Sequence, residues 1–189
     1  GLLLLFNATA MFVCTLLSVY LDDGATEGLL FSALITIGIG LLLLLITRNR
    51  KREIKMRDGY LTVVMGWLSM VIFGTLPYLL TQSLVSYSDA LFETMSGFTA
   101  TGATIVQDIE ALPKSIILWR SLTHWLGGMG IIVLAVAILP LLGIGGVQLF
   151  SAEATAIGGD KLHPRFSYTA KRLCYIYVGF TVLEALILA

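Results

Sequence analysis

Several stretches of this chain run for about 20 residues with almost no charged side chains. An α-helix needs about 20 apolar residues to cross a hydrocarbon core of about 30 Å. Charged residues make up 13% of the chain and hydrophobic residues 57%, whereas about a quarter of a soluble domain is charged. We therefore expect an all-α membrane protein with lipid around it. Its expected membrane helices are residues 1–21, 28–47, 60–80, 115–140 and beyond, and the beginning of another at 173–189.

Two basic segments determine the expected topology. Residues 48–59 carry six Lys and Arg against two acids, and residues 161–172 carry four Lys and Arg together with His163. Cytoplasmic loops are enriched in Lys and Arg, so both segments are expected to be cytoplasmic, the second as part of a loop at 151–172. A nucleic-acid patch is the alternative for the first segment, but it would lie between two membrane helices. The formal net charge is zero, so we expect no nucleic-acid partner.

Between two of the apolar runs lies a segment that is too short and too polar to cross a membrane. A helix over residues 89–98 would be about 15 Å long, roughly half of the hydrocarbon core. If residues 89–104 crossed the membrane, the second basic segment would lie outside. We therefore expect the helix to enter from the outside and the chain to return there as residues 99–104, before an inward helix over 115–150. Non-helical backbone at that depth must be buried by protein or line a water-filled path.

Residues 99–104, Thr-Ala-Thr-Gly-Ala-Thr, are named the filter loop below. A dehydrated potassium ion is held by rings of oxygens, usually backbone carbonyls. Gly102 allows the positive φ that such a path needs, and Thr99, Ala100 and Thr101 are small. The C-terminal end of the preceding helix also favours a cation. We therefore predict an ion or substrate site in this loop. The alternative is an ordinary tight turn.

Four further residues are predicted to support the filter loop: Glu93, Thr104, Arg120 and His124. Arg120 and His124 lie four residues apart on the inward helix, near its outer end, where they hold the loop or face the outer water. An intramembrane enzyme using His124 with Glu93 or Arg120 is a further alternative. No Ser/His/Asp or metal-ligand spacing supports it, so no catalytic residue is predicted and the protein is not expected to be an enzyme.

Two further features lie within the apolar runs, an acidic residue and a glycine-rich segment. Glu184 is an acid inside an apolar run, and such residues are candidates for functional sites. The segment Gly127-Gly128-Met129-Gly130 favours close helix packing over a hinge.

Residues 92–104 and 119–140 together resemble the membrane subunit of the bacterial Trk potassium uptake system, in the TrkH/KtrB superfamily of potassium transporters. In that family a repeat consists of helix, pore helix, filter and helix, and four repeats of one polypeptide surround a single pore. The resemblance implies two leading helices at 1–47, a first repeat at 60–150 and the start of a second repeat at 168–189. Only one filter is visible, so we expect either part of a longer protein or an assembly of several copies.

The resemblance also implies a function. It implies potassium uptake across the bacterial inner membrane, with potassium as the substrate and no cofactor. It also implies that the filter is Thr99, Ala100, Thr101 and Gly102, with the ion at Ala100 and Thr101. Serine in place of this glycine accompanies sodium transport in plant relatives, so Gly102 points to potassium. The expected partners are a second copy of the full-length protein and a cytoplasmic nucleotide-binding regulatory subunit. The alternative is a secondary transporter of another solute, with the broken helix as its midplane binding site.

Overall fold

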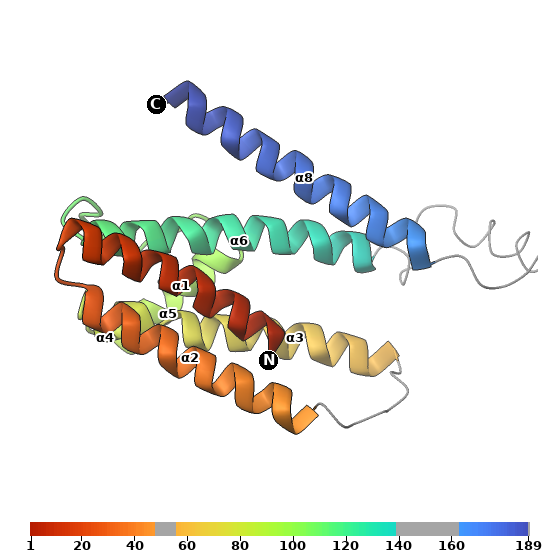
Figure 1. The fold of residues 1–189 in the computed structure, drawn as a ribbon, viewed down its shortest axis with the longest axis horizontal. Helices are drawn as coiled ribbons and strands as arrows, with labels where there is room; N and C mark the ends of the chain where they lie inside the picture. The colour runs from red at the N-terminus through yellow and green to blue at the C-terminus, as the bar shows by residue number, and fades with distance from the viewer. Residues whose placement is uncertain (48–55, 139–162, 189) are drawn as a thin grey trace, which may run out of the picture. The chain divides into compact units, whose positions relative to one another are not determined.

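The computed structural model describes residues 1–47, 56–138 and 163–188, and these form helices without any strand. This confirms the predicted all-α fold. The chain divides into two compact units, Gly1–Trp125 and Leu126–Ala189, which are described separately. In chain order the helices are α1 (Leu2–Leu21), α2 (Thr26–Thr47), α3 (Met56–Gly74), α4 (Leu76–Leu80), α5 (Tyr87–Phe98), α6 (Lys114–Ile138) and α8 (His163–Leu188), as Figure 1 shows.

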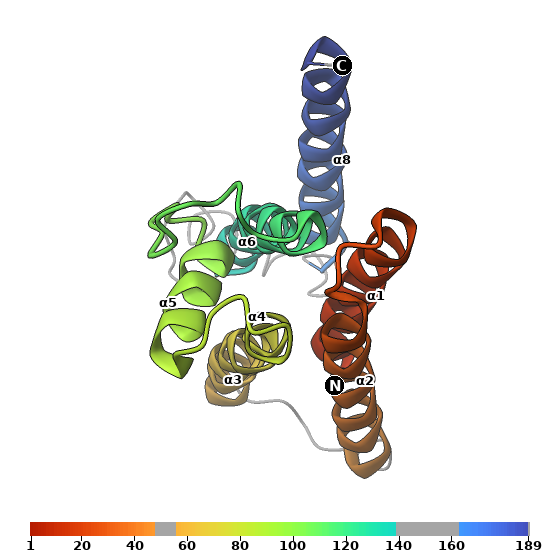
Figure 2. The same ribbon diagram turned by 90° about the vertical axis from the view of Figure 1, so that its left-hand side faces the viewer.

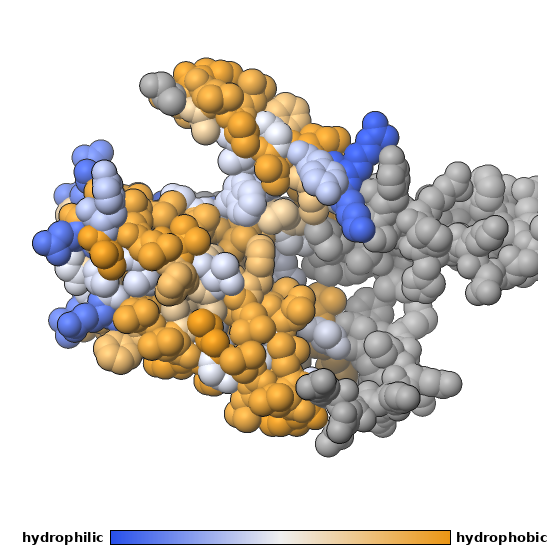
Figure 3. All heavy atoms as spheres, in the orientation of Figure 1, coloured by the Kyte–Doolittle hydropathy of each residue, from blue (hydrophilic) through white to orange (hydrophobic). Residues whose placement is uncertain are grey.

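Three helical segments among the described residues are long and apolar enough to cross a membrane: Leu2–Leu21, Thr26–Thr47 and Leu61–Leu80. The other two predicted membrane segments are helical where they are described, in α6 and α8, but they are not among these three. Large apolar side chains cover the outer flank of α1 and α2, while hydrophilic atoms gather at the end where the α1–α2 loop lies (Figure 3). This distribution suits a lipid environment for the flank and water for that end.

The first unit is built around the α1–α2 pair and the α3–α4 segment. Figure 2 shows α3 and α4 lying between the α1–α2 pair and α5. The Asn7 side chain is fully buried, and its Nδ2 donates a hydrogen bond to the Met70 carbonyl of α3 at 3.3 Å. The buried apolar residues of α1 recur every three or four positions, as one face of a helix requires: Leu4, Ala8, Met11 and Cys14.

The helix predicted over residues 60–80 is interrupted near its end, at Thr75. α3 ends at Gly74, and α4 begins at Leu76 with Pro77 in its first turn. Proline lacks an N–H and its ring collides with the carbonyl four residues earlier, whereas the first turn of a helix tolerates it. Thr75 N still donates to Val71 O at 3.1 Å and Leu79 N donates to Thr75 O at 3.2 Å, so helical hydrogen bonds continue on both sides of the interruption.

Several other boundaries differ from those predicted. α5 begins at Tyr87, two residues before the expected start at 89. α8 begins at His163, so residues 163–172 of the loop predicted at 151–172 are helical. The basic segment at 48–55 and the predicted end of the inward helix at 150 lie outside the described residues.

Candidate cation-binding site

The segment containing α5 leaves one end of the first unit and returns to the same end. At the start of α2, a Cβ on Gly28 would lie 2.8 Å from the Thr81 backbone nitrogen, so the chain after α4 passes beside this point. At the start of α6, Ser115 N donates to Asp23 Oδ2 in the α1–α2 loop at 2.9 Å. α5 and the chain that follows it therefore form a re-entrant excursion, which confirms the predicted path.

The far end of this excursion lies deep along α6. Gly97, in the last turn of α5, packs against Thr123, and a Cβ on Gly97 would lie 2.9 Å from Thr123 Cβ. Thr123 is nine residues after the first residue of α6, which corresponds to about 14 Å of helix. The filter loop follows directly, at a depth of nearly half a hydrocarbon core of about 30 Å.

α5 ends in a Schellman motif that turns the chain into the filter loop. Thr101 N donates to Ser96 O at 3.0 Å, and Ala100 N donates to Gly97 O at 2.9 Å. This pair of bonds requires a left-handed residue between the helix and the outgoing chain, usually glycine. Here the residue is Ala100, with φ 54°. The motif uses the carbonyls of the last turn, so the next free carbonyls belong to the filter loop.

Gly102 adopts the positive φ predicted for it, 78°, and open space surrounds the position where a Cβ would be. Within the described part of the chain, no hydrogen bond is made to the carbonyl oxygens of Thr99, Ala100, Thr101 or Gly102. All four residues are exposed. The site therefore presents consecutive small residues with uncommitted carbonyl oxygens, which are the ligands that a dehydrated monovalent cation needs.

Glu93 is the centre of the contacts behind the filter loop. Its side chain is 0% exposed, and its carboxylate accepts hydrogen bonds from Thr104 Oγ1 at 3.0 Å and from Ile105 N at 3.1 Å. Arg120 Nε of α6 donates to Glu93 Oε1 at 2.5 Å. A buried carboxylate is tolerated only when it is paired and hydrogen-bonded. This one carboxylate therefore joins α5, the filter loop and α6, and it brings together three of the four predicted support residues.

The fourth support residue, His124, lies beside the last turn of α5, where a Cβ on Gly97 would be 3.6 Å from its Nδ1. Its Nδ1 lies 3.0 Å from the Arg120 carbonyl of its own helix. The Glu93 carboxylate is already occupied by Thr104, Ile105 and Arg120, so the geometry offers no pairing of His124 with Glu93 for acid–base chemistry. Among the described residues there is also no group of His, Cys, Asp and Glu that could hold a metal ion.

Hydroxyl contacts also shape the filter loop, and the one made by Ser96 was not expected from the sequence. Ser96 Oγ, on the last turn of α5, donates to the Ala103 carbonyl at 2.5 Å. The Thr99 and Thr101 hydroxyls lie 2.7 Å apart, and Thr99 Oγ1 also donates to Met95 O at 2.8 Å. The available signal was a serine one helical turn before the predicted loop, where a short hydroxyl reaches the chain that follows.

Glycines allow α3 and α6 to approach α5 closely. A Cβ on Gly74 would lie 2.7 Å from Thr94 Cγ2 and 2.8 Å from Phe98 Cε2. The Gly74 carbonyl also accepts a hydrogen bond from Trp119 Nε1 of α6 at 3.2 Å, and Trp119 is fully buried. Three helices thus meet at one glycine, directly beside the C-terminal half of α5.

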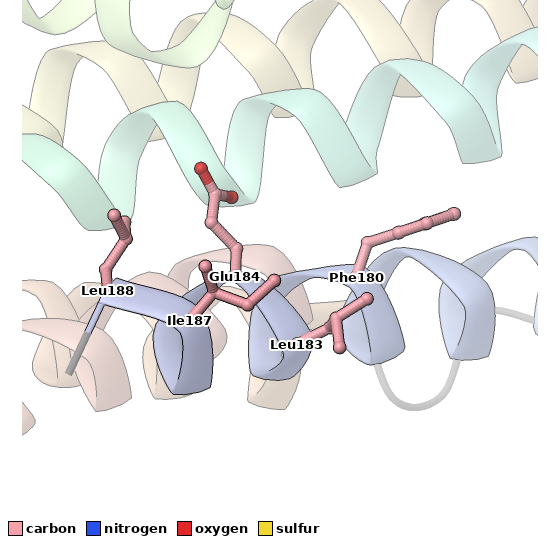
Figure 4. A pocket seen from close by; sticks show the side chains of 5 residues that line it. All are labelled: Phe180, Leu183, Glu184, Ile187 and Leu188. Atoms are coloured by element: carbon pink, nitrogen blue, oxygen red, sulfur yellow. The ribbon is translucent and has the colours of Figure 1, made fainter.

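The second unit contains the other candidates from the sequence. A Cβ on Gly128 would lie 2.7 Å from the Tyr177 hydroxyl, which supports the packing interpretation for this glycine segment. Glu184 is exposed on α8 and borders a hollow whose described lining also comes from α8 (Figure 4). None of the described residues donates a hydrogen bond to its carboxylate, so its role stays a hypothesis.

Comparison with known proteins gives consistent matches. A family model described as TrkH, cation transport protein, matches residues 29–189. The Trk system potassium uptake protein TrkH of Halomonas elongata is 43% identical over 98% of this chain and 39% of the relative. The protein of the same name from Escherichia coli is 41% identical over 100% of this chain and 39% of the relative.

A solved structure also matches. It is the crystal structure of the potassium transporter TrkH from Vibrio parahaemolyticus, with a TM-score of 0.81 and 38% identity over 97% of this chain and 36% of that chain. The chain therefore spans about two fifths of the length of the curated relatives that it matches. Because the family model covers most of the chain, this protein belongs to the TrkH family of cation transport proteins.

Proposed function

We propose that the full-length protein takes up potassium across the bacterial inner membrane and that the filter loop supplies part of the ion-binding site. The observation that carries this proposal is that the carbonyl oxygens from Thr99 to Gly102, all in exposed residues, accept no hydrogen bond from the described part of the chain. The loop is held from the α5 side by the hydrogen bond from Ser96 Oγ to the carbonyl of the next residue, Ala103. Relatives at 41–43% identity bear the name Trk system potassium uptake protein, which supports potassium as the ion.

In this proposal the ion exchanges its water shell for backbone carbonyls, principally those of Ala100 and Thr101. The C-terminal end of α5 adds partial negative charge at the same place. Glu93, Thr104 and Arg120 hold the loop in position without touching the ion. One loop provides only a fraction of a coordination shell, so the remaining oxygens come from the rest of the longer protein, in which residues 60–150 form a first repeat.

The segments around the first repeat and the partners of the full-length protein belong to the same proposal. Residues 1–47 are leading helices, and the second repeat starts at residue 168, within α8. Residues 48–59 and 151–172 are cytoplasmic. The full-length protein works as a homodimer in lipid and is regulated by a nucleotide-binding subunit on its cytoplasmic side.

Flux measurements test this function. Liposomes that contain the purified full-length protein should admit potassium and rubidium in preference to sodium and lithium. Gly102→Ser should lower the potassium-to-sodium flux ratio by about tenfold or more, because a side chain at φ 78° adds a strain of roughly 1–2 kcal/mol to the loop that holds the ion. Gly38→Ser is the matched control, since open space also surrounds a Cβ at Gly38 but its φ is not positive.

An unchanged flux ratio in Gly102→Ser would contradict the role of the filter loop. Absence of any cation flux from the folded protein, measured with its regulatory subunit present, would contradict potassium transport itself. That second outcome would favour transport of another solute by the broken helix.

A further inference from the structure

Asp23, in the loop between α1 and α2, is hydrogen-bonded to the first turn of α6. Its two carboxylate oxygens serve different parts of the first unit. Oδ1 accepts from Ser18 Oγ at 2.5 Å and from Ala25 N at 3.3 Å, both within the α1–α2 loop region. Oδ2 accepts from Ser115 N, in the first turn of α6, at 2.9 Å. Asp23 therefore joins two segments that are 92 positions apart in the sequence.

The bond to Ser115 is an N-terminal cap supplied by a distant segment. The first N–H groups of a helix have no partner within the helix, and a carboxylate at this end also interacts favourably with the helix dipole. Burial raises the pKa of Asp23, but hydrogen bonds from Ser18, Ser115 and Ala25 outweigh this effect and leave its pKa below the ordinary value. The carboxylate is therefore charged at neutral pH, as a strong cap requires.

The outer half of α6 is well placed to transmit this constraint. Ser115, Ile116 and Trp119 are fully buried, and Trp119 is bonded to the Gly74 carbonyl of α3. Arg120 follows Ser115 by five residues, or about 7.5 Å along the helix. It forms the ion pair with Glu93, whose carboxylate holds Thr104 and Ile105 of the returning chain.

We propose that Asp23 is a positioning residue for the filter loop, acting through α6 and the Arg120–Glu93 pair. This rests on the function proposed above for that loop. When the cap is lost, the first turn of α6 frays and Arg120 holds Glu93 less firmly. The Glu93 carboxylate is then less well compensated, and the Thr104–Ile105 segment opens more often. The expected result is a less selective ion site in a protein that still folds.

Asp22 provides a matched control beside Asp23. It carries the same charge in the same loop, but it is exposed and has a positive φ of 50°. Asparagine adopts this left-handed conformation readily, so Asp22→Asn removes one negative charge without straining the loop. If the negative charge of the α1–α2 loop alone affected cation flux, the effect would appear in both Asp22→Asn and Asp23→Asn. A positioning effect appears only in the Asp23 variant.

The test uses the full-length protein and two measurements. The first is amide hydrogen exchange at Ile105, whose N–H is bound to Glu93. Asp23→Ala should speed this exchange by about twofold to thirtyfold, the range that corresponds to loss of a helix cap. The second is the potassium-to-sodium flux ratio in liposomes, which should fall in Asp23→Ala and keep the wild-type value in Asp22→Asn. A lower number of folded molecules would reduce both fluxes equally and leave the ratio unchanged.

Faster exchange confined to the first turn of α6, with Ile105 and the flux ratio at wild-type values, would overturn the proposal. If Asp23→Ala does not fold, Asp23→Asn replaces it, because this variant keeps one acceptor oxygen. It should show smaller changes in the same direction in Ile105 exchange and in the flux ratio. Wild-type values of both in Asp23→Asn would also overturn the proposal. Failure of the proposed function is separable, because the exchange measurement needs no transport. In a protein without cation flux, faster Ile105 exchange still supports the link from Asp23 to the loop, and unchanged exchange overturns it.

Discussion

Ala100 has a backbone conformation that its own side chain disfavours. It occupies the left-handed position of the Schellman motif at φ 54°, where glycine is usual. The conformation persists because the bonds from Ala100 N to Gly97 O and from Thr101 N to Ser96 O fix the chain on both sides. The filter loop therefore contains moderate backbone strain at Ala100, and this strain results from the Schellman motif that ends α5.

This strain predicts the effect of Ala100→Gly. Glycine adopts positive φ without steric cost, so the free energy of unfolding should stay the same or rise by up to about 1 kcal/mol. Ala103→Gly is the control, because Ala103 does not have a positive φ, and it should stay the same or fall. Thermal unfolding of the full-length protein in detergent compares the two variants. A clear loss of stability in Ala100→Gly alone would contradict the assignment of strain.

Among the helices, α5 is fixed less by its own sequence than by its fit against α3 and α6. Gly74 of α3 and Gly97 of α5 each mark a point where no side chain fits between two helices. Such close approach suits a membrane interior, where small residues allow van der Waals packing between helices. The depth of the filter loop consequently depends on two glycines that contact no ion.

The contact at Gly97 predicts the effect of Gly97→Ala. The new methyl group would overlap Thr123 Oγ1, and overpacking of this kind costs about 1–3 kcal/mol. We expect lower thermal stability and a lower potassium-to-sodium flux ratio. Adding Thr123→Ala removes the overlapping atom and should restore part of both. Gly38→Ala is the control: with open space around it, this change should be neutral or raise stability by up to about 1 kcal/mol. No recovery in the double variant would contradict the proposed contact.

The sequence predicted α5 and its return path because the length of a helix and the charge of a loop can both be read from short stretches of sequence. Together these two quantities restrict the topology. The sequence also predicted the positive φ of Gly102, because few other residues adopt that conformation easily. It did not predict the break at Thr75 between α3 and α4. Ser96, Asp23 and Gly74 were missed because their partners lie between 7 and 92 positions away. Such contacts depend on how whole helices pack, which no local pattern records.

For the whole molecule, the side of the membrane on which the α1–α2 loop lies follows from the basic segments. The positive-inside rule predicts that residues 48–59 are cytoplasmic and that Asp22 and Asp23 therefore lie outside. Asp22→Cys, in a full-length protein without other accessible cysteines, should react with an impermeant thiol reagent added from outside the cell. Lys51→Cys should react only after the membrane is opened. The reverse pattern of labelling would contradict the topology and, with it, the outward-facing entrance of the filter loop.

The bond between Asp23 and Ser115 also has a consequence for how the protein is made. A growing chain inserts α1 and α2 long before residue 115 leaves the ribosome, because synthesis proceeds at about 5–20 residues per second. α5 is also made before Arg120, and until Arg120 follows the Glu93 carboxylate lacks its cation. The contacts behind the filter loop are therefore complete only when α6 arrives.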